Sequence, residues 1–212
     1  QPNSSKFMTS GGIGLTYNDG ENYIGVSLDK LEAAYSLPGA EGEENLTSLN
    51  PTRNSISFKS SLALNNNFFK KINFDGTVSE YNHAERTTSG NNHNIEFFND
   101  AYEFKTSLNH KSLFSQNEDG LIGFHFQNKN QGAEGAEESH LTSTKTNSFA
   151  FFILENFKFN YFDLDIGGRF ESVNLKNTTY ERGFFPGAFS STIKKELFPN
   201  NTAFFGFDFT QR

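Results

Sequence analysis

Hydrophobic and polar residues alternate along most of this chain with a period of two, which predicts β-strands rather than helices. In one such segment, Ile72, Phe74, Gly76 and Val78 alternate with the polar residues Asn73, Asp75 and Thr77. Because successive side chains of a strand point to opposite faces, each segment has one apolar and one polar face. The sequence therefore predicts an all-β protein built from amphipathic strands.

The alternating segments number roughly ten in 212 residues, or about 21 residues for each strand with its connection. Soluble β-sandwiches repeat their strands about every 8–12 residues. A strand that crosses a membrane needs about 9–11 residues and gains length where it projects beyond the bilayer. The spacing thus favours long membrane-crossing strands. The predicted strands are residues 7–17, 22–33, 54–65, 70–83, 95–110, 120–128, 146–155, 158–175, 188–197 and 202–212.

The connections alternate between compact turns and long polar loops. Residues 17–22 and 64–68 are short and rich in turn-forming residues, whereas residues 38–53, 86–94 and 129–147 are long and polar. Short turns at one end of a sheet and long loops at the other are typical of transmembrane barrels. We therefore expect an antiparallel up-and-down meander that belongs to a large transmembrane β-barrel. Two alternatives remain: a soluble or surface-displayed all-β ligand-binding module, carbohydrate-binding or adhesin-like, and a small complete ten-stranded barrel.

Composition agrees with amphipathic strands. The chain has 26 Phe and no Cys or Trp, and only 34% of its residues are hydrophobic, whereas ordinary cores rely on aliphatic residues. A mean hydropathy of −0.61 and the lack of long apolar runs exclude a bundle of membrane-spanning helices. The net charge of −7 argues against a nucleic-acid partner. The absence of Cys excludes disulfide scaffolds and thiolate metal sites.

Six segments, in order along the chain, are similar to the barrel of TonB-dependent outer-membrane receptors. The first begins Tyr-Ile-Gly-Val-Ser and ends Leu-Pro-Gly, and resembles the family's strand and following loop "Y-x-G-V-S … Y-G-L-P-G". Another, Asp-Ile-Gly-Gly-Arg-Phe-Glu, resembles "G-x-R-x-E" in a late barrel strand. The ordered set is similar above all to the zinc-uptake branch. The segments are residues 23–39, 79–85, 98–103, 135–138, 165–171 and 210–212.

This resemblance implies a barrel of about 22 strands, a plug domain inside it, and import of a ligand driven by the TonB complex. Residues 1–212 would then be a partial barrel domain, in contact with outer-membrane lipid, and the plug and last strands would lie outside it. The ligand implied is a metal ion or metal chelate, either zinc or an iron–siderophore; no bound cofactor is expected. The loop after Gly39 has Glu41, Glu43 and Glu44 but no His, which departs from the zinc-type receptors.

Two groups of residues are candidate metal ligands. His83 and Glu85 lie two apart, so they share the polar face of their strand, where an imidazole and a carboxylate suit a divalent cation. Glu137, Glu138 and His140 crowd into one loop, which concentrates negative charge beside an imidazole. Either group also fits a hydrated surface.

Signatures of enzymes are missing from the sequence. It has no G-x-S-x-G elbow, H-E-x-x-H pair, P-loop or dinucleotide fingerprint, so we expect no enzymatic activity. His125 lies on the polar side of its segment and is interpreted as a residue facing the lumen. The mixed charges of Asp163, Asp165, Arg169 and Glu171 are interpreted in the same way.

Overall fold

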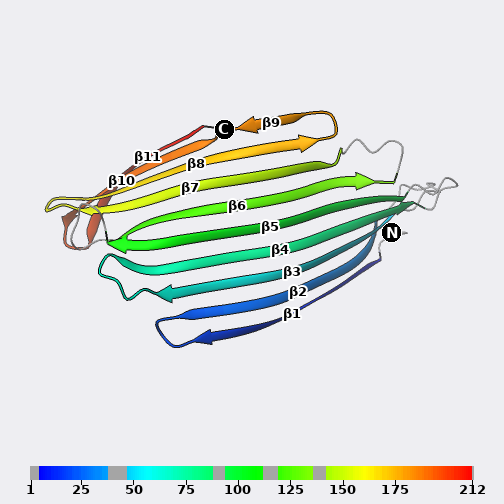
Figure 1. Cartoon of the computed structure of the whole chain (residues 1–212), viewed down its shortest axis with the longest axis horizontal. Helices are drawn as coiled ribbons and strands as arrows, with labels where there is room; N and C mark the ends of the chain where they lie inside the picture. Colours follow the sequence, from blue (N-terminus) through cyan, green and yellow to red (C-terminus); the bar gives the residue numbers. More distant parts are fainter. Residues whose placement is uncertain (1–4, 38–46, 88–93, 112–118, 136–141, 212) are drawn as a thin grey trace.

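The computed structural model describes residues 5–37, 47–87, 94–111, 119–135 and 142–211, which form one antiparallel sheet (Figure 1). These ranges contain no helix that is long and apolar enough to cross a membrane. The strands are β1 (Lys6–Asn18), β2 (Tyr23–Leu37), β3 (Thr47–Ala63), β4 (Phe69–Thr87), β5 (Asn94–Lys111), β6 (Asp119–Glu134), β7 (Thr144–Lys158), β8 (Asp163–Asn177), β9 (Glu181–Phe184), β10 (Gly187–Phe198) and β11 (Asn201–Gln211).

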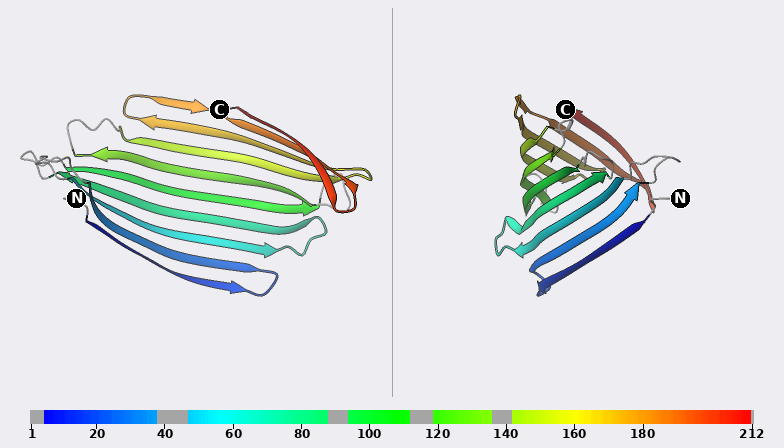
Figure 2. Two further views of the ribbon diagram at one scale, coloured as in Figure 1. Left: turned by 180° about the vertical axis from the view of Figure 1, so that it is seen from behind. Right: turned by 90° about the vertical axis from the view of Figure 1, so that its right-hand side faces the viewer.

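Each strand pairs with its neighbour in sequence from β1 to β8, and β10 and β11 complete the order. The short strand β9 pairs with the far end of β8, at residues 173–176, and β10 takes the remainder of the same edge. The sheet is bent, so its strands trace an open arc when viewed from one side (Figure 2). The meander predicted from the sequence is therefore confirmed.

The register places the apolar residues of successive strands directly opposite one another. In one cross-strand row, Val26 pairs with Phe58, Phe104 with Phe126, and Phe126 with Phe149. Such direct pairs share one face of the sheet. The result is an apolar belt across the sheet. Its members include Ile13, Leu15, Ile24, Val26, Leu28, Ile56, Phe58, Phe74, Val78, Tyr102, Phe104, Leu108, Ile122, Phe124, Phe126, Phe149, Phe151, Ile153, Phe157, Leu164, Ile166, Phe170, Phe189, Ile193, Phe205, Phe207 and Phe209.

The two faces differ in exposure. Along β2, Ile24, Val26 and Leu28 are 42%, 45% and 50% exposed, whereas their neighbours Tyr23, Gly25 and Ser27 on the polar face are half-buried or buried. Side chains converge on the concave side of a bent sheet and diverge on the convex side. We therefore assign the polar face to the inside of the arc and the apolar belt to its outside.

The belt runs obliquely across the strands. The belt is centred on Val26 in β2 and on Phe207 in β11. Followed from strand to strand through directly paired residues, Val26 leads to Phe149 on β7, and Phe207 leads to Glu155 on β7. The two rows are therefore six residues apart on β7, across eight strand-to-strand steps. With about 3.3 Å per residue and about 4.8 Å between strands, the belt slants by roughly 30°.

Several strand boundaries differ from the sequence prediction. Strand β3 begins at Thr47 instead of residue 54, although it contains Pro51. The pairing of β3 with β2 is interrupted at Pro51, which has no backbone N–H, while pairing with β4 continues. Residues 158–175 were predicted as one strand, but a turn separates β7 from β8 at residues 159–162. The four-residue β9 was not predicted.

The two structural alternatives do not match the described residues. A soluble sandwich requires Phe side chains packed between two sheets, but these residues form a single sheet, and Phe170 and Phe205 are 70% and 72% exposed. A closed ten-stranded barrel requires β1 and β11 to pair. They lie at opposite margins of the sheet, and each pairs on one side only within the described ranges.

Candidate functional site on the polar face

The predicted ligands His83 and Glu85 lie near the end of β4, on the polar face as expected. His83 Nε2 is 3.9 Å from Glu85 Oε1, which is too long for a hydrogen bond. The His83 ring contacts the ring of Phe97, with centroids 5.6 Å apart, and its Nε2 atom is buried without a hydrogen-bond partner. His83 therefore packs against an aromatic side chain, with one ring nitrogen left unsatisfied.

The other predicted ligands, Glu137, Glu138 and His140, lie outside the described residues, as do Glu41, Glu43 and Glu44. Their loop follows β6, whose last residue Glu134 is at the same end of the sheet as the last residue of β4. Within the described part of the chain, no three His, Cys, Asp or Glu residues gather closely enough to hold a metal ion. The metal site predicted from the sequence thus remains a prediction.

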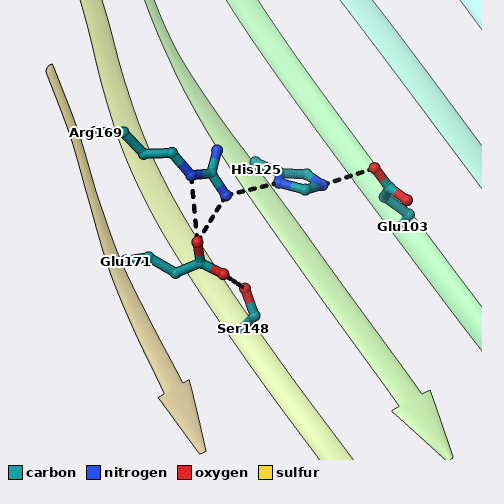
Figure 3. Close-up of polar contacts among 5 residues, drawn as sticks. All are labelled: Glu103, His125, Ser148, Arg169 and Glu171. Atoms are coloured by element: carbon teal, nitrogen blue, oxygen red, sulfur yellow. Dashed lines mark hydrogen bonds and ion pairs between the residues drawn. The ribbon is translucent and has the colours of Figure 1, made fainter. Parts of the chain in front are cut away.

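A polar network crosses four strands on the same face (Figure 3). His125 of β6 lies between Glu103 of β5 and Arg169 of β8, with its Nε2 2.7 Å from Glu103 Oε1. Arg169 Nη2 is 3.1 Å from His125 Nδ1, so the guanidinium donates to the imidazole. Arg169 also donates to Glu171 Oε2 through Nε and Nη2, at 3.2 and 2.9 Å, and Ser148 of β7 donates to the other oxygen.

The donors and acceptors of this network fix the histidine tautomer. An arginine side chain only donates hydrogen bonds, so Nδ1 of His125 accepts and carries no proton. The proton of the neutral ring is then on Nε2 and points to Glu103. The serine hydroxyl is bound to a carboxylate instead of the imidazole, so the group does not form the nucleophile–base pair of a hydrolase. Its chemistry is that of recognition through fixed charges.

A hollow on the concave side borders this network directly. Arg169 and Glu171 line a cavity of about 200 Å³ together with Ala188 of β10 and Thr210 of β11. Arg169 is about one-third exposed and Glu103 about one-half, so both charged groups can contact a ligand on the concave side. The arrangement presents a cation between two anions to the inside of the arc.

Sequence reasoning found some members of the network and missed others. The positions of His125, Arg169 and Glu171 on the polar face were predicted, but their contact was not. Glu103 and Ser148 were not singled out, because alternation assigns a face and does not say which residues of other strands lie opposite. The register places Lys105 opposite His125, with Glu103 two residues further along β5 on the same face, within reach of a long side chain.

No protein-family model matches the sequence. No curated protein matches it either. Among solved structures, the fold is similar to the alcaligin outer-membrane receptor FauA from Bordetella pertussis, with a TM-score of 0.62 and 8% sequence identity. The match covers 94% of this chain and 34% of the receptor, so the chain spans about a third of that protein's length. At this identity the likeness concerns the fold: the chain forms an antiparallel meander like part of an outer-membrane receptor barrel. The narrower resemblance to zinc-uptake receptors receives no support from these comparisons.

Proposed function

We propose that this sheet is a wall segment of a transmembrane β-barrel in the outer membrane of a Gram-negative cell, and that the barrel imports a metal ion or metal chelate. The observation that carries the proposal is the apolar belt on the convex face, with polar residues on the concave face. A transmembrane barrel turns an apolar band toward lipid and a polar surface toward its lumen.

The slant of the belt supports a membrane more than a folded core. Strands of outer-membrane barrels tilt by about 35–45° from the barrel axis, so a band level with the membrane must cross them obliquely. The slant of roughly 30° is close to this range. On β7 the belt extends from Phe149 to Phe157, eight residues or roughly 26 Å along the strand, close to the height of about 25 Å that an apolar band needs.

The open margins support a larger assembly. Strands β1 and β11 each pair on one side only within the described ranges, which leaves two rows of backbone groups to be satisfied. In lipid such groups require partners, because no water is present to bind them. We infer that further strands close the barrel to about 22, with a plug domain inside that responds to the TonB complex.

The ligand is proposed from two observations. The likeness to a receptor for alcaligin favours an iron chelate, and the polar network at Arg169 offers fixed charges on the lumen side. The acidic loop residues Glu137 and Glu138, with His140, favour capture of a cation such as zinc. Both ligands fit import by a receptor without enzymatic chemistry.

Lipid contact is tested with two neighbouring residues on opposite faces of β4. Val78 is 51% exposed on the belt, and Thr77 is exposed on the polar face. Because these 212 residues have no Cys, Val78→Cys and Thr77→Cys each introduce a single Cys into this part of the barrel for labelling with a fluorophore. We expect brominated phospholipids to quench the label at position 78 strongly and at position 77 weakly. Equal quenching at the two positions would contradict the orientation of the sheet.

Transport is tested separately in cells. Deletion of the gene should reduce uptake of radiolabelled zinc, or of radiolabelled iron given as a siderophore chelate, to the level of cells that lack TonB. Deletion of this gene together with the gene for TonB should reduce uptake no further than either deletion alone. Unchanged uptake of both ligands after deletion would refute the import proposal, while the lipid orientation would still be judged by the quenching experiment.

A further inference from the structure

A carboxylate lies within the apolar belt, where ionised groups are costly. Glu155 of β7 is on the belt face between Ile153 and Phe157, opposite Ile166 of β8. Only 6% of the residue is exposed, and both carboxylate oxygens are buried without a hydrogen-bond partner among the described residues. A buried acid without partners is rare in proteins and requires a physical explanation.

The nearest polar group is a buried histidine on the same face. His110 of β5 is 2% exposed, and its Nε2 is 3.4 Å from Glu155 Oε1. The two side chains meet above Gly120 of the intervening strand β6, which pairs directly with His110. A Cβ atom at position 120 would collide with the His110 ring and lie 2.8 Å from Glu155 Oε2. The contact therefore depends on the absence of a side chain at this glycine.

The hydrogen bonds of His110 determine how many protons the pair holds. Its Nδ1 is 2.7 Å from the carbonyl oxygen of Lys111, so Nδ1 carries a proton and donates it. One further proton between Nε2 and Glu155 gives either an imidazolium with a carboxylate or an imidazole with a carboxylic acid. Both forms are neutral overall. Loss of that proton leaves the pair with one negative charge, and a second added proton leaves it with one positive charge. Either net charge is costly in an apolar setting.

An aromatic ring from the adjacent turn covers the pair. The ring of Phe68 stacks on His110 with centroids 5.4 Å apart, and the Phe68 carbonyl accepts from the backbone N–H of Lys111. Asn66 Oδ1 holds the turn by accepting from the N–H groups of Phe68 and Phe69, at 2.8 and 3.2 Å. Seating of this turn on the sheet thus depends directly on the imidazole face beneath Phe68.

Other charged groups near the pair lie on the opposite face or are paired. Lys70, at the bulge in β4, forms an ion pair with Asp119. The charged residues closest to this pair along β4, β5, β7 and β8 alternate onto the polar face; they are Lys71, Lys111, Lys158, Asp163 and Asp165. No charged group of the described strands therefore shares the belt-face surroundings of His110 and Glu155.

We propose that Glu155 and His110 share one proton as a neutral pair, and that this pair is a proton-sensitive latch for the 64–68 turn. Removal of the shared proton puts a net charge beneath Phe68 and unseats its ring. The placement of the belt against lipid rests on the proposed function, but the burial and contacts of the pair do not.

The latch is tested in the complete protein in phospholipid vesicles, with 4-fluorophenylalanine at position 68 observed by fluorine NMR across a pH series. We expect one seated signal that gives way to a second signal as the pH rises. In Glu155→Gln, whose amide stays neutral, the alkaline transition should be lost while the seated signal persists. His110→Ala should lose the seated signal at all pH values.

The other histidine–glutamate contact provides a matched control. Glu103→Gln alters the His125 pair on the polar face and should leave the fluorine signal and its pH profile unchanged. An unaltered alkaline transition in Glu155→Gln would overturn the proposal. At the pH where the Phe68 signal is seated, an ionised Glu155 in carbon NMR alongside an imidazole that is not doubly protonated would overturn it as well. The competing explanation, that the pair binds a metal cation, is tested by adding zinc sulfate. A saturable shift of the Phe68 signal that Glu155→Gln abolishes would assign the pair to a cation instead of a proton.

Discussion

The sharpest test of the membrane orientation places an arginine at different depths along β7. The belt face of this strand carries Phe149, Phe151, Ile153 and Phe157, and the slant of the belt places its middle near Ile153. Arginine on the lipid face of a barrel costs about 2–4 kcal/mol at the bilayer midplane and about 0–1 kcal/mol near the interfaces. Phe149 and Phe157 are each four residues from Ile153, or roughly 13 Å along the strand, so they lie near the interfaces.

Each arginine variant is compared with alanine at the same position, because alanine removes the native side chain without adding charge. We expect the difference between Ile153→Arg and Ile153→Ala to be about 2–4 kcal/mol in the free energy of unfolding, and at Phe149 and Phe157 about 0–1 kcal/mol. Thr146→Arg, on the polar face of the same strand, should cost little. The long arginine side chain can reach toward the headgroups, which lowers the cost. We therefore expect the value for Ile153→Arg in the lower half of the range of about 2–4 kcal/mol.

The assay is reversible unfolding by guanidinium in phospholipid vesicles, followed by far-UV circular dichroism because the chain has no Trp. The change in stability is read from the midpoint at constant slope. A cost that is uniform along β7, or a cost for Thr146→Arg equal to that for Ile153→Arg, would refute the assignment of this face to lipid.

Three further predictions follow from local geometry. Gly120→Ala should destabilise the protein by about 1–3 kcal/mol, because its Cβ collides with His110 and Glu155, whereas Gly183→Ala, whose Cβ meets nothing within 4 Å, should be nearly neutral; unfolding titrations compare them. Asp19, in the β1–β2 turn, accepts hydrogen bonds from Asn22 and Glu21 that lower its pKa from 3.8 to about 2. Because the pKa of Asp19 is lower in the folded than in the unfolded protein, its contribution to stability is complete above pH 3.8 and is lost as the pH falls to about 2. Carbon-detected NMR titration of Asp19 should give the low pKa, and Asn22→Ala should raise it. Arg169→Lys should break the two-pronged contact with Glu171 and free Nδ1 of His125, which nitrogen NMR would register as a changed His125 signal, while Arg182→Lys should leave that signal unaltered.

The sequence alone determined which residues share a face. The alternation in residues 70–83 and 95–110 assigned Phe74 and Phe104 to the apolar side and His83 and Glu85 to the polar side, and the structure places them there. This works because the side-chain period of a strand is two regardless of what the strand pairs with. Strand boundaries were less accessible: the sequence prediction began β3 at residue 54, yet pairing on the β4 side extends that strand past Pro51 to Thr47.

Only the tertiary structure decided which side chains meet across strands. Glu103, His125, Arg169 and Ser148 come from four strands, and a shift of register by two residues would keep every face assignment and separate these groups. The same holds for Glu155, which alternation places on the apolar face, between Ile153 and Phe157. Its explanation, a histidine two strands away above a glycine, depends on the register of β5, β6 and β7, since period-two patterning carries no information on how neighbouring strands align.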